Sequence, residues 1–476
     1  MAVDKPKAVE PELDEEDEWQ LYASAGYAST GFILEETETV EDKQPDDVWF
    51  DGDGDDFEGN TVNWDAPPCP APLGIAHLIK IGVCDFCLHR IGGRRSDERG
   101  AEAGAVLRRE AYVRDEELPS KVPQDFCPLC ENLFDDINNI VERVSESLSG
   151  TDYSTIQFGI HLPKDLIQEE DRIRSRYGAP GSYPLKSALV EAIHHRIRAV
   201  NDRVDFVKER PDIMVLVDGL TLRVDVDVRP IFLYGRYRKL VRDLPQTRWP
   251  CRACRGRAEG CESCGGTGLQ YPDSVQDLIG EPIREVLDAD DTSFHGMGRE
   301  DIDVRCLGSG RPFVLEIKRP SKRNHSLDDL VVRVNENASG KVELDSLSWC
   351  DRSKVHKVKQ SRSEKTYTIR FRADDLPDEK TVISAISSLS GVVIDQETPK
   401  RVSHRRAAKI RRRRVVSVSS ILVEGDEVQF SARCEAGTYV KELVHSDEGR
   451  TVPSVQSAID RECEVLWLDV EEIHAD

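Results

Sequence analysis

The sequence has no apolar run approaching the roughly 20 residues that a membrane-spanning helix needs. Acidic residues stand near its N-terminus, where a secretory signal would carry lysines followed by an apolar segment. Neither Gly-x-x-x-x-Gly-Lys-Ser/Thr nor Gly-x-Gly-x-x-Gly occurs, so a phosphate-cradling nucleotide site is not supported. We therefore expect a soluble, cytoplasmic protein that has no membrane contact and uses no organic cofactor.

Positive charge is also scarce, with 65 lysines and arginines against 89 aspartates and glutamates, a formal net charge of -24. The imbalance is concentrated in residues 1–60, where 20 acidic and 3 basic side chains carry -17, which leaves -7 for residues 61–476. Lysine is the rarer base, at 20 against 45 arginines, whose planar fork suits phosphates and base edges. The acidic total therefore does not argue against a nucleic-acid partner. Few lysines and many acids are also typical of a protein adapted to high salt.

Composition divides the chain, which is long enough for about three domains. Residues 1–68 predict an acidic, disordered tail, because they combine like charges with little apolar periodicity. Residues 69–235 predict an accessory domain that begins with the first dense apolar cluster and the first cysteine pairs. Residues 236–476 predict a second, larger domain, entered through the basic and aromatic run Tyr234 to Lys239.

Hydrophobic periodicity assigns helices and strands within both domains. In the accessory domain we expect a helix from Leu133 to Val144, a strand near 156–160, a helix at 185–200, and strands at 213–217 and 222–228. In the second domain Asp273 or Ser274 should start a helix that runs to Leu287. Strands are expected there at 302–306, 312–318, 330–334, 366–372, 414–423, 427–433 and 464–470. The fold class is therefore α+β, with a mixed, mostly antiparallel sheet in the second domain.

Eight of the 13 cysteines form four Cys-x-x-Cys pairs. In a large chain without a secretory signal such pairs more often bind metal than form disulfides. The compact group Cys251, Cys254, Cys261 and Cys264 stands among glycines and predicts a tetrahedral zinc knuckle at 251–264. A second group, Cys84, Cys87, Cys127 and Cys130, predicts a shared structural zinc across a longer gap. Iron-sulfur clusters and independent buried or redox cysteines remain alternatives, and the single cysteines are interpreted as packing residues.

The segment from Phe294 to Arg305 holds the densest chemistry. If residues 299–305 are extended, period two places two arginines and two aspartates on one face. Such pairing keeps an aspartate ionised and oriented, as a carboxylate nucleophile requires. A salt-bridged, exposed strand would give the same pattern, so the alternation alone leaves both interpretations open. The four residues are Arg299, Asp301, Asp303 and Arg305.

A basic stripe follows near the C-terminal end of the second domain. Nine cationic side chains fall between residues 400 and 414, with no acid among them. The functional interpretation is that these side chains contact phosphates. The alternative is a solvent-exposed segment whose positive charge offsets the negative charge of an acidic protein. The stripe consists of Lys400, Arg401, Arg405, Arg406, Lys409 and Arg411 to Arg414.

Several short motifs, in one order along residues 230–470, resemble the archaeal-type Pus-ten family of tRNA pseudouridine synthases. They are Tyr234-Gly-Arg-Tyr, Pro245-Gln-Thr247, Gly298-Arg-Glu-Asp301 with Asp303-Val-Arg305, Gly310-Arg-Pro-Phe313, Gln396-x-Thr-Pro399, Arg401-Val-x-His-Arg-Arg406, Ala436 to Glu442, and Gly449-Arg-Thr451. In the N-terminal half, residues 105–230 resemble a THUMP-containing RNA-binding module, and the cysteine pairs resemble the family's zinc site. The acidic tail departs from the family pattern.

The resemblance implies a pseudouridine synthase that acts on uridine 54, uridine 55 or both in the TΨC arm of tRNA. Asp301 matches the aspartate nucleophile, with Asp303 as the second choice. The same resemblance implies that Tyr367 and Tyr439 stand against the target base, and that Arg299 fills the space of the flipped nucleotide or holds the nucleophile. It further implies tRNA as partner and a monomer. The candidates for RNA contact are Arg401, Arg405, Arg406, Lys409 and Lys441.

A function of a different class stays open. The cysteine groups and the basic stripe would also suit a zinc-dependent RNA-binding or chaperone-like protein without any chemistry. A methylating or thiolating THUMP enzyme is weakened by the missing nucleotide-binding motifs.

Overall fold

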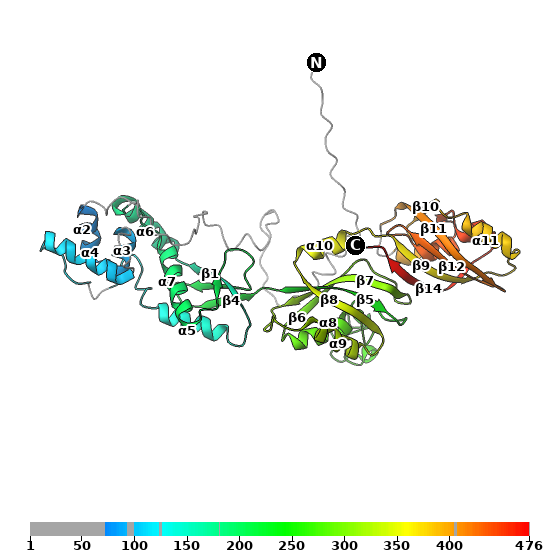
Figure 1. Ribbon diagram of the computed structural model, residues 1–476, viewed down its shortest axis with the longest axis horizontal. Helices are drawn as coiled ribbons and strands as arrows, with labels where there is room; N and C mark the ends of the chain where they lie inside the picture. Colours follow the sequence, from blue (N-terminus) through cyan, green and yellow to red (C-terminus); the bar gives the residue numbers. More distant parts are fainter. Residues whose placement is uncertain (1–71, 93–99, 123–125, 180, 404–406, 476) are drawn as a thin grey trace, which may run out of the picture. The chain divides into compact units, whose positions relative to one another are not determined.

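The computed structural model describes residues 72–92, 100–122, 126–179, 181–403 and 407–475 (Figure 1). The described chain divides between Arg229 and Pro230 into two compact units. The acidic segment 1–60, Arg405 and Arg406 lie outside the described residues. In the described part of the chain, no helix is both long enough and apolar enough to cross a membrane.

The N-terminal unit combines helices with a four-stranded sheet in the order β2-β1-β3-β4. β1 runs parallel to β2 and β3, and β3 is antiparallel to β4. The strands are β1 (Thr155–His161), β2 (Asp205–Phe206), β3 (Ile213–Asp218) and β4 (Val224–Val228). The helices are α2 (Pro72–Lys80), α3 (Asp85–Gly92), α4 (Gly100–Arg114), α5 (Ile137–Ser147), α6 (Lys164–Tyr177) and α7 (Leu185–Val200).

One core joins the helices of this unit to its sheet. Ile140 and Val144 of α5, Leu189 and Ile193 of α7 and the alternating Val215 of β3 are all buried in it. The spacings of four in the helices and two in the strand are those on which the sequence assignments depended. The strands β1, β3 and β4 and the helix α7 are therefore confirmed, while α5 begins at Ile137 rather than Leu133.

The C-terminal unit is built on a ten-stranded sheet, ordered β13-β10-β11-β12-β9-β14-β7-β5-β8, with β6 paired to β7. Only β14 and β7 run parallel among these pairs, so the sheet is mixed and mostly antiparallel, as the sequence predicts. Its strands are β5 (Ile231–Lys239), β6 (Asp291–Gly296), β7 (Arg305–Lys318), β8 (Val342–Cys350), β9 (Lys365–Arg372), β10 (Val393–Glu397), β11 (Ile410–Glu424), β12 (Glu427–Cys434), β13 (Thr451–Val452) and β14 (Glu464–Ile473).

Helices cover both faces of this sheet, and the central strand β7 shows it. Phe313 and Leu315 of β7 enter one core, whereas Val314 between them enters the other. A strand buried on both faces reads as a continuous apolar run, which is why Phe313 to Leu315 show no alternation. In Figure 1, α8 and α9 lie together on the first of these faces. The helices are α8 (Val275–Val286), α9 (Leu327–Ala338), α10 (Ser353–Gln360), α11 (Glu379–Ser387), α12 (Val440–His445) and α13 (Val455–Ile459), with short 3-10 turns η2 (Glu262–Cys264) and η3 (Lys400–Val402).

Two strand predictions in this unit were wrong. Residues 330–334 belong to helix α9, whose buried Leu330, Val334 and Ala338 repeat every four residues and whose start is capped by Ser326. The run of β-branched residues favours a strand locally, but burial of one helical face outweighs that preference. Residues 302–304 likewise form a turn before β7 rather than the start of a strand. The helix at 275–286 is confirmed, and the Ser274 hydroxyl accepts the Asp277 N–H as its cap.

Candidate active site and metal centres

The loop 297–304 between β6 and β7 carries the candidate nucleophile. It is not extended, so Arg299, Asp301, Asp303 and Arg305 do not share one strand face as the alternation predicted. The chain turns at Gly298, whose φ of 73° lies in the left-handed region that glycine adopts without strain. The alternation of charged residues shows which side chains would share a face only if the chain were extended. Contacts from outside the loop decide its conformation here.

A fully buried lysine holds the backbone of this loop. Lys239, at the end of β5, donates from Nζ to the carbonyl oxygens of Ile302 at 2.9 Å, Asp301 at 3.3 Å and Leu244 at 2.8 Å. Burial lowers the pKa of this amine, and the charge of Glu300 partly offsets that effect. Two of these acceptors are consecutive carbonyls of the loop, so one buried ammonium fixes the backbone at Asp301 and Ile302.

A second buried cluster anchors the residue next to the candidate nucleophile. The Glu300 carboxylate accepts the Tyr237 hydroxyl at 2.9 Å and lies 2.8 Å from Nε of Arg311, with both charged side chains at most 1% exposed. Arg311 also donates to the Met297 carbonyl at 2.7 Å, and Gln246 donates to the Gly298 carbonyl at 3.0 Å. The glutamate therefore points inward. Asp301, the next residue, is left on the accessible side of the loop.

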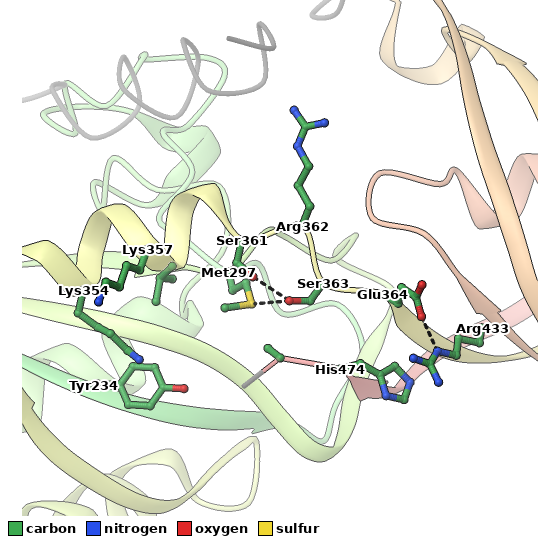
Figure 2. A pocket seen from close by; sticks show the side chains of 12 residues that line it. Tyr234, Met297, Lys354, Lys357, Ser361, Arg362, Ser363, Glu364, Arg433 and His474 are labelled. Atoms are coloured by element: carbon green, nitrogen blue, oxygen red, sulfur yellow. Dashed lines mark hydrogen bonds and ion pairs between the residues drawn. The ribbon is translucent and has the colours of Figure 1, made fainter. Parts of the chain in front are cut away.

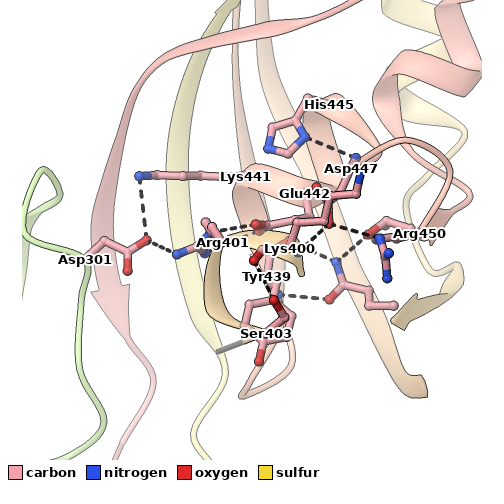
Figure 3. Close-up of polar contacts among 12 residues, drawn as sticks. Asp301, Lys400, Arg401, Ser403, Tyr439, Lys441, Glu442, His445, Asp447 and Arg450 are labelled. Carbon is pink, nitrogen blue, oxygen red and sulfur yellow. Dashed lines mark hydrogen bonds and ion pairs between the residues drawn. The ribbon is translucent and has the colours of Figure 1, made fainter. Parts of the chain in front are cut away.

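Two cations that are distant in the sequence converge on Asp301 (Figure 3). Arg401 donates from Nη1 to Oδ2 at 2.9 Å, and Nζ of Lys441 lies 3.6 Å from the same oxygen. The Asp301 side chain stays 32% exposed, so this carboxylate is both paired and accessible, as is that of Asp303 at 51% exposed. Lys441 pairs more closely with Asp303, at 2.7 and 2.9 Å. Partial burial would raise the pKa of Asp303, but this ion pair outweighs it and lowers the pKa.

Arg401 is itself held from behind by Glu442 of α12. Its Nε donates to Oε1 of Glu442 at 2.6 Å and Nη2 donates to Oε2 at 3.4 Å, and the glutamate is 1% exposed. A bidentate contact of this kind orients a planar guanidinium. The third donor, Nη1, is thereby directed to Asp301. Arg401 and Lys441, two of the candidates for RNA contact, thus lie on the two aspartates in this structure.

The two candidate tyrosines come from different elements. Tyr439 immediately precedes α12, and its backbone exchanges two 2.9 Å hydrogen bonds with the Gln396 amide. Its ring lies 6.0 Å from the guanidinium carbon of Arg401 and 5.9 Å from that of Arg411. Tyr367 lies on central strand β9, between β12 and β14. Burial and the nearby negative charges raise its pKa well above the usual value, with the Asp301 carboxylate among those charges.

The other basic candidates in the described part of the chain, Arg299 and Lys409, have contacts with other groups. The exposed Arg299 places its guanidinium 5.1 Å from the centre of the Trp249 ring. Lys409 is exposed at the start of β11, and its backbone N–H donates to the Thr398 hydroxyl at 3.1 Å. Arg411 also donates to that hydroxyl, at 2.9 Å. Only part of the stripe is described, and in that part both Arg401 and Arg411 lie near the Tyr439 ring.

The two cysteine groups each bring four thiols together, as the spacing predicts. In both groups all four sulfur atoms lie within 4.8 Å of one another. A tetrahedral zinc with Zn–S bonds of about 2.3 Å would separate its sulfurs by about 3.8 Å. The structure has 3.6 Å for Cys84 to Cys130, 4.0 Å for Cys251 to Cys261 and 3.8 Å for Cys254 to Cys264. The donor sets therefore fit tetrahedral zinc.

The surroundings of the two groups differ. In the N-terminal group three thiols are buried in the core of that unit, and the Cys84 N–H donates to the Cys127 sulfur at 3.2 Å. In the central group three are half-buried, and the Gly268 N–H donates to the Cys264 sulfur at 3.2 Å. Backbone N–H groups aimed at sulfur favour the thiolate that metal binding requires. The grouping indicates two sites, each completed within its own unit.

Several residues of this site were missed from the sequence. Lys239, Glu300, Arg311 and Glu442 are buried charges, which the pattern does not distinguish from surface charges. The available signal was their position inside the resemblance motifs, since Glu300 lies in Gly298-Arg-Glu-Asp301 and Glu442 ends the Ala436 motif. Buried charges need partners, and those partners are unknown until the strands are ordered.

A family model described as "Pus10, C-terminal" matches residues 232–474, and one described as "Pus10 THUMP domain, archaeal" matches residues 140–218. A relative from Methanothrix thermoacetophila named "tRNA pseudouridine synthase Pus10" is 36% identical over 83% of this chain and 92% of its own. One of the same name from Halorubrum lacusprofundi is 35% identical over 82% of this chain and 92% of its own.

Among solved structures, a Cbf5-Nop10-Gar1 complex aligns with 40% of this chain and 43% of that chain, at 18% identity and a TM-score of 0.26, which is too low to support an argument. The family models and the relatives carry the assignment. They cover both described units, and the family resemblance that the motifs indicated is confirmed. The chain belongs to the Pus10 family, whose curated members are named tRNA pseudouridine synthases.

Proposed function

We propose that this protein isomerises uridine 54, uridine 55 or both in the TΨC arm of tRNA, with Asp301 as nucleophile. The observation that carries the proposal is one accessible carboxylate on which Arg401 and Lys441 converge. The relatives named tRNA pseudouridine synthase supply the substrate class. The choice of position in the TΨC arm comes from the motif resemblance.

In the proposed reaction a carboxylate oxygen of Asp301 attacks C1′ of the target uridine and the bond between C1′ and N1 of uracil breaks. The uracil turns, C5 attacks C1′ and the bond between C1′ and Asp301 breaks, after which C5 loses its proton and N1 gains one. The cations beside Asp301 pair with its carboxylate before attack and would pair with it again when the product leaves. The Glu442 contact keeps Arg401 in place while this charge changes. Isomerisation consumes no oxidant, reductant or energy source.

We further propose that Tyr367 and Tyr439 contact the flipped base and that Arg299 fills the space it leaves, since an enzyme acting on a paired base must extrude it. Arg401 and Lys441 would then exchange part of their contact with aspartate for RNA phosphate as substrate binds. Arg405, Arg406 and Lys409 would extend that contact along the same segment. These roles follow the resemblance, and the described residues among them lie in the C-terminal unit.

For the domains we propose an acidic tail at 1–68, a zinc-bearing accessory domain at 69–235 and a catalytic domain at 236–476. The THUMP match at 140–218 supports RNA binding by the accessory domain. The two cysteine groups would each hold one structural zinc, which orders the chain around it and takes no part in the chemistry. We expect the protein to act as a monomer in the cytoplasm.

The test is to incubate the full chain with unmodified tRNA transcript, mark pseudouridine with a carbodiimide, and map reverse-transcriptase stops across the TΨC arm. Wild type should give stops that vanish in Asp301→Asn, while tRNA affinity changes by no more than a few fold. Asp303→Asn is the matched control, because Asp303 lies on the same loop and pairs with the same lysine. Stops that survive in Asp301→Asn and vanish in Asp303→Asn would reverse the assignment of the nucleophile.

The alternative is a zinc-dependent RNA-binding protein without chemistry, supported by the cysteine groups and the basic stripe. It predicts measurable tRNA binding with no stops in wild type at any salt concentration. Salt must be varied because phosphate contacts weaken steeply as its concentration rises. One experiment therefore separates the two functions.

A further inference from the structure

A hollow of about 510 Å³ opens in the C-terminal unit, outside the contacts of Asp301. It lies between helix α10, the connection from α10 to β9, and the ends of β12 and β14. Figure 2 shows the side chains that line it. Its lining includes Met297, the first residue of the loop 297–304 that carries Asp301.

The lining is strongly cationic. Lys354, Lys357, Arg362 and Arg433 contribute four positive charges, and Glu364, which accepts from Arg433 Nε at 2.6 Å, is the lining carboxylate. Low-dielectric walls on several sides strengthen the field of a charged hollow. The bound group should therefore be an anion.

The polar groups have the chemistry that binds phosphate. Lys354 and Lys357 are three residues apart on α10 and so share a helix face. The Tyr234 ring lies 4.3 Å from Nζ of Lys354, which holds that ammonium at the rim of the hollow. The Ser361 and Ser363 hydroxyls lie 2.8 Å from each other on the same wall. Lysine and hydroxyl donors are typical contacts to the phosphates of nucleic acids.

The position of the hollow connects it to the candidate nucleophile. On one side Ser363 donates to the Met297 sulfur at 3.6 Å, and Met297 is the first residue of the loop 297–304. On the other side the Glu364–Arg433 pair stands at the ends of β9 and β12, where Arg433 is paired in register with Thr366. An RNA strand that brings its uridine to Asp301 would pass close to this hollow.

We propose that the hollow binds a backbone phosphate of the RNA strand that carries the target uridine. The proposal rests on the proposed function, because it places substrate RNA against the C-terminal unit. The hollow would contribute affinity and register on the RNA. It would contribute nothing to bond breaking.

The first test compares Lys354→Gln/Lys357→Gln with wild type in single-turnover reactions on tRNA transcript over a range of salt. The control is Arg333→Gln/Lys380→Gln, which removes the same charge from exposed positions of α9 and α11. The concentration of enzyme at half-maximal rate should rise about three- to tenfold in the hollow variant, while the maximal rate stays within twofold. The dependence of log affinity on log salt should become shallower by about 0.7 to 0.9, the value for loss of one neutralised phosphate, and it should stay unchanged in the control if those exposed positions touch no phosphate.

The second test identifies the source of the phosphate. TΨC stem-loop substrates, each with one neutral methylphosphonate linkage, are titrated against wild type and the hollow variant. One linkage should weaken wild type about as much as the lysine changes do and should have no further effect on the variant. Inorganic phosphate is tested as a competitor, because inhibition lost in the variant without any sensitive linkage would indicate a free-phosphate site and overturn the proposal.

Two more results would also overturn it. Equal affinities in the hollow variant and the control would show that the lysines touch no phosphate. A lower maximal rate at unchanged affinity would show that they act on the loop through Met297. If wild type makes no pseudouridine, the proposed function fails, and filter binding of tRNA by the same variants still tests the hollow.

Discussion

Replacing Glu300 by leucine should destabilise the C-terminal unit severely, although Glu300 touches no substrate in our proposal. The change leaves the Arg311 guanidinium, 1% exposed, without its carboxylate and removes the acceptor of the Tyr237 hydroxyl. Breaking a buried ion pair from one side typically costs about 3 to 5 kcal/mol. That is a large part of the roughly 5 to 15 kcal/mol that stabilises a typical domain.

The assay is scanning calorimetry of the zinc-loaded full chain, because two compact units are expected to give more than one transition. For a unit of this size about 1 kcal/mol shifts the midpoint by about 2 to 4 °C, so the affected transition should fall by about 6 to 20 °C. Glu285→Leu on the exposed side of α8 is the control and should shift it by less than about 2 °C.

A double variant tests the reasoning behind this magnitude. Glu300→Leu with Arg311→Met replaces both charges by apolar groups, which can be nearly neutral where the single change is not. The double variant should therefore recover at least half of the lost stability. If Glu300→Leu alone costs less than about 1 kcal/mol, or if the two changes simply add, the cluster does not anchor the loop as we describe.

Three further predictions follow from other groups. Burial, and next the charge of Arg198, lowers the pKa of His194 to about 4, so below pH 6.5 the folded state binds fewer protons than the unfolded state. The free energy of unfolding, measured by urea titration, should therefore fall by up to about 3 kcal/mol between pH 6.5 and 4. His194→Phe should make this pH dependence weaker. The Tyr439 hydroxyl is buried without a hydrogen-bond partner in the described part of the chain, so Tyr439→Phe should leave the unfolding midpoint within about 0.5 kcal/mol while slowing pseudouridine formation; a destabilised variant would mean that the hydroxyl has a structural partner. Cys264→Ser should reduce bound zinc from two ions to one by elemental analysis and lower the melting midpoint, and retention of two ions would contradict a four-thiolate site.

Local patterns carried much of the fold. Ser274 predicted the start of α8, the alternating valines predicted β3 and β4, and the Cys-x-x-Cys pairs predicted both sulfur groups. Each of these signals is contained within a few residues or within one repeated spacing. The same kind of signal failed at residues 330–334, where β-branched residues favour a strand but Leu330 and Val334 pack one face of a helix. The intrinsic preference of these residues for a strand is outweighed by the burial of one helical face.

The candidate site divides in the same way. By itself the sequence determined the family, the aspartate in Gly298-Arg-Glu-Asp301 and the residue types around it, because these are short contiguous motifs that can be recognised without the fold. Only the tertiary structure decided which charges meet, since the partners of Asp301 and Asp303 stand 100 and 138 residues away. The order of strands determines these contacts. It therefore also determines which carboxylate is buried beside Arg311 and which stays accessible. The alternation of charges in the sequence does not predict which carboxylate is buried, because a buried charge requires partners that only the fold brings near it.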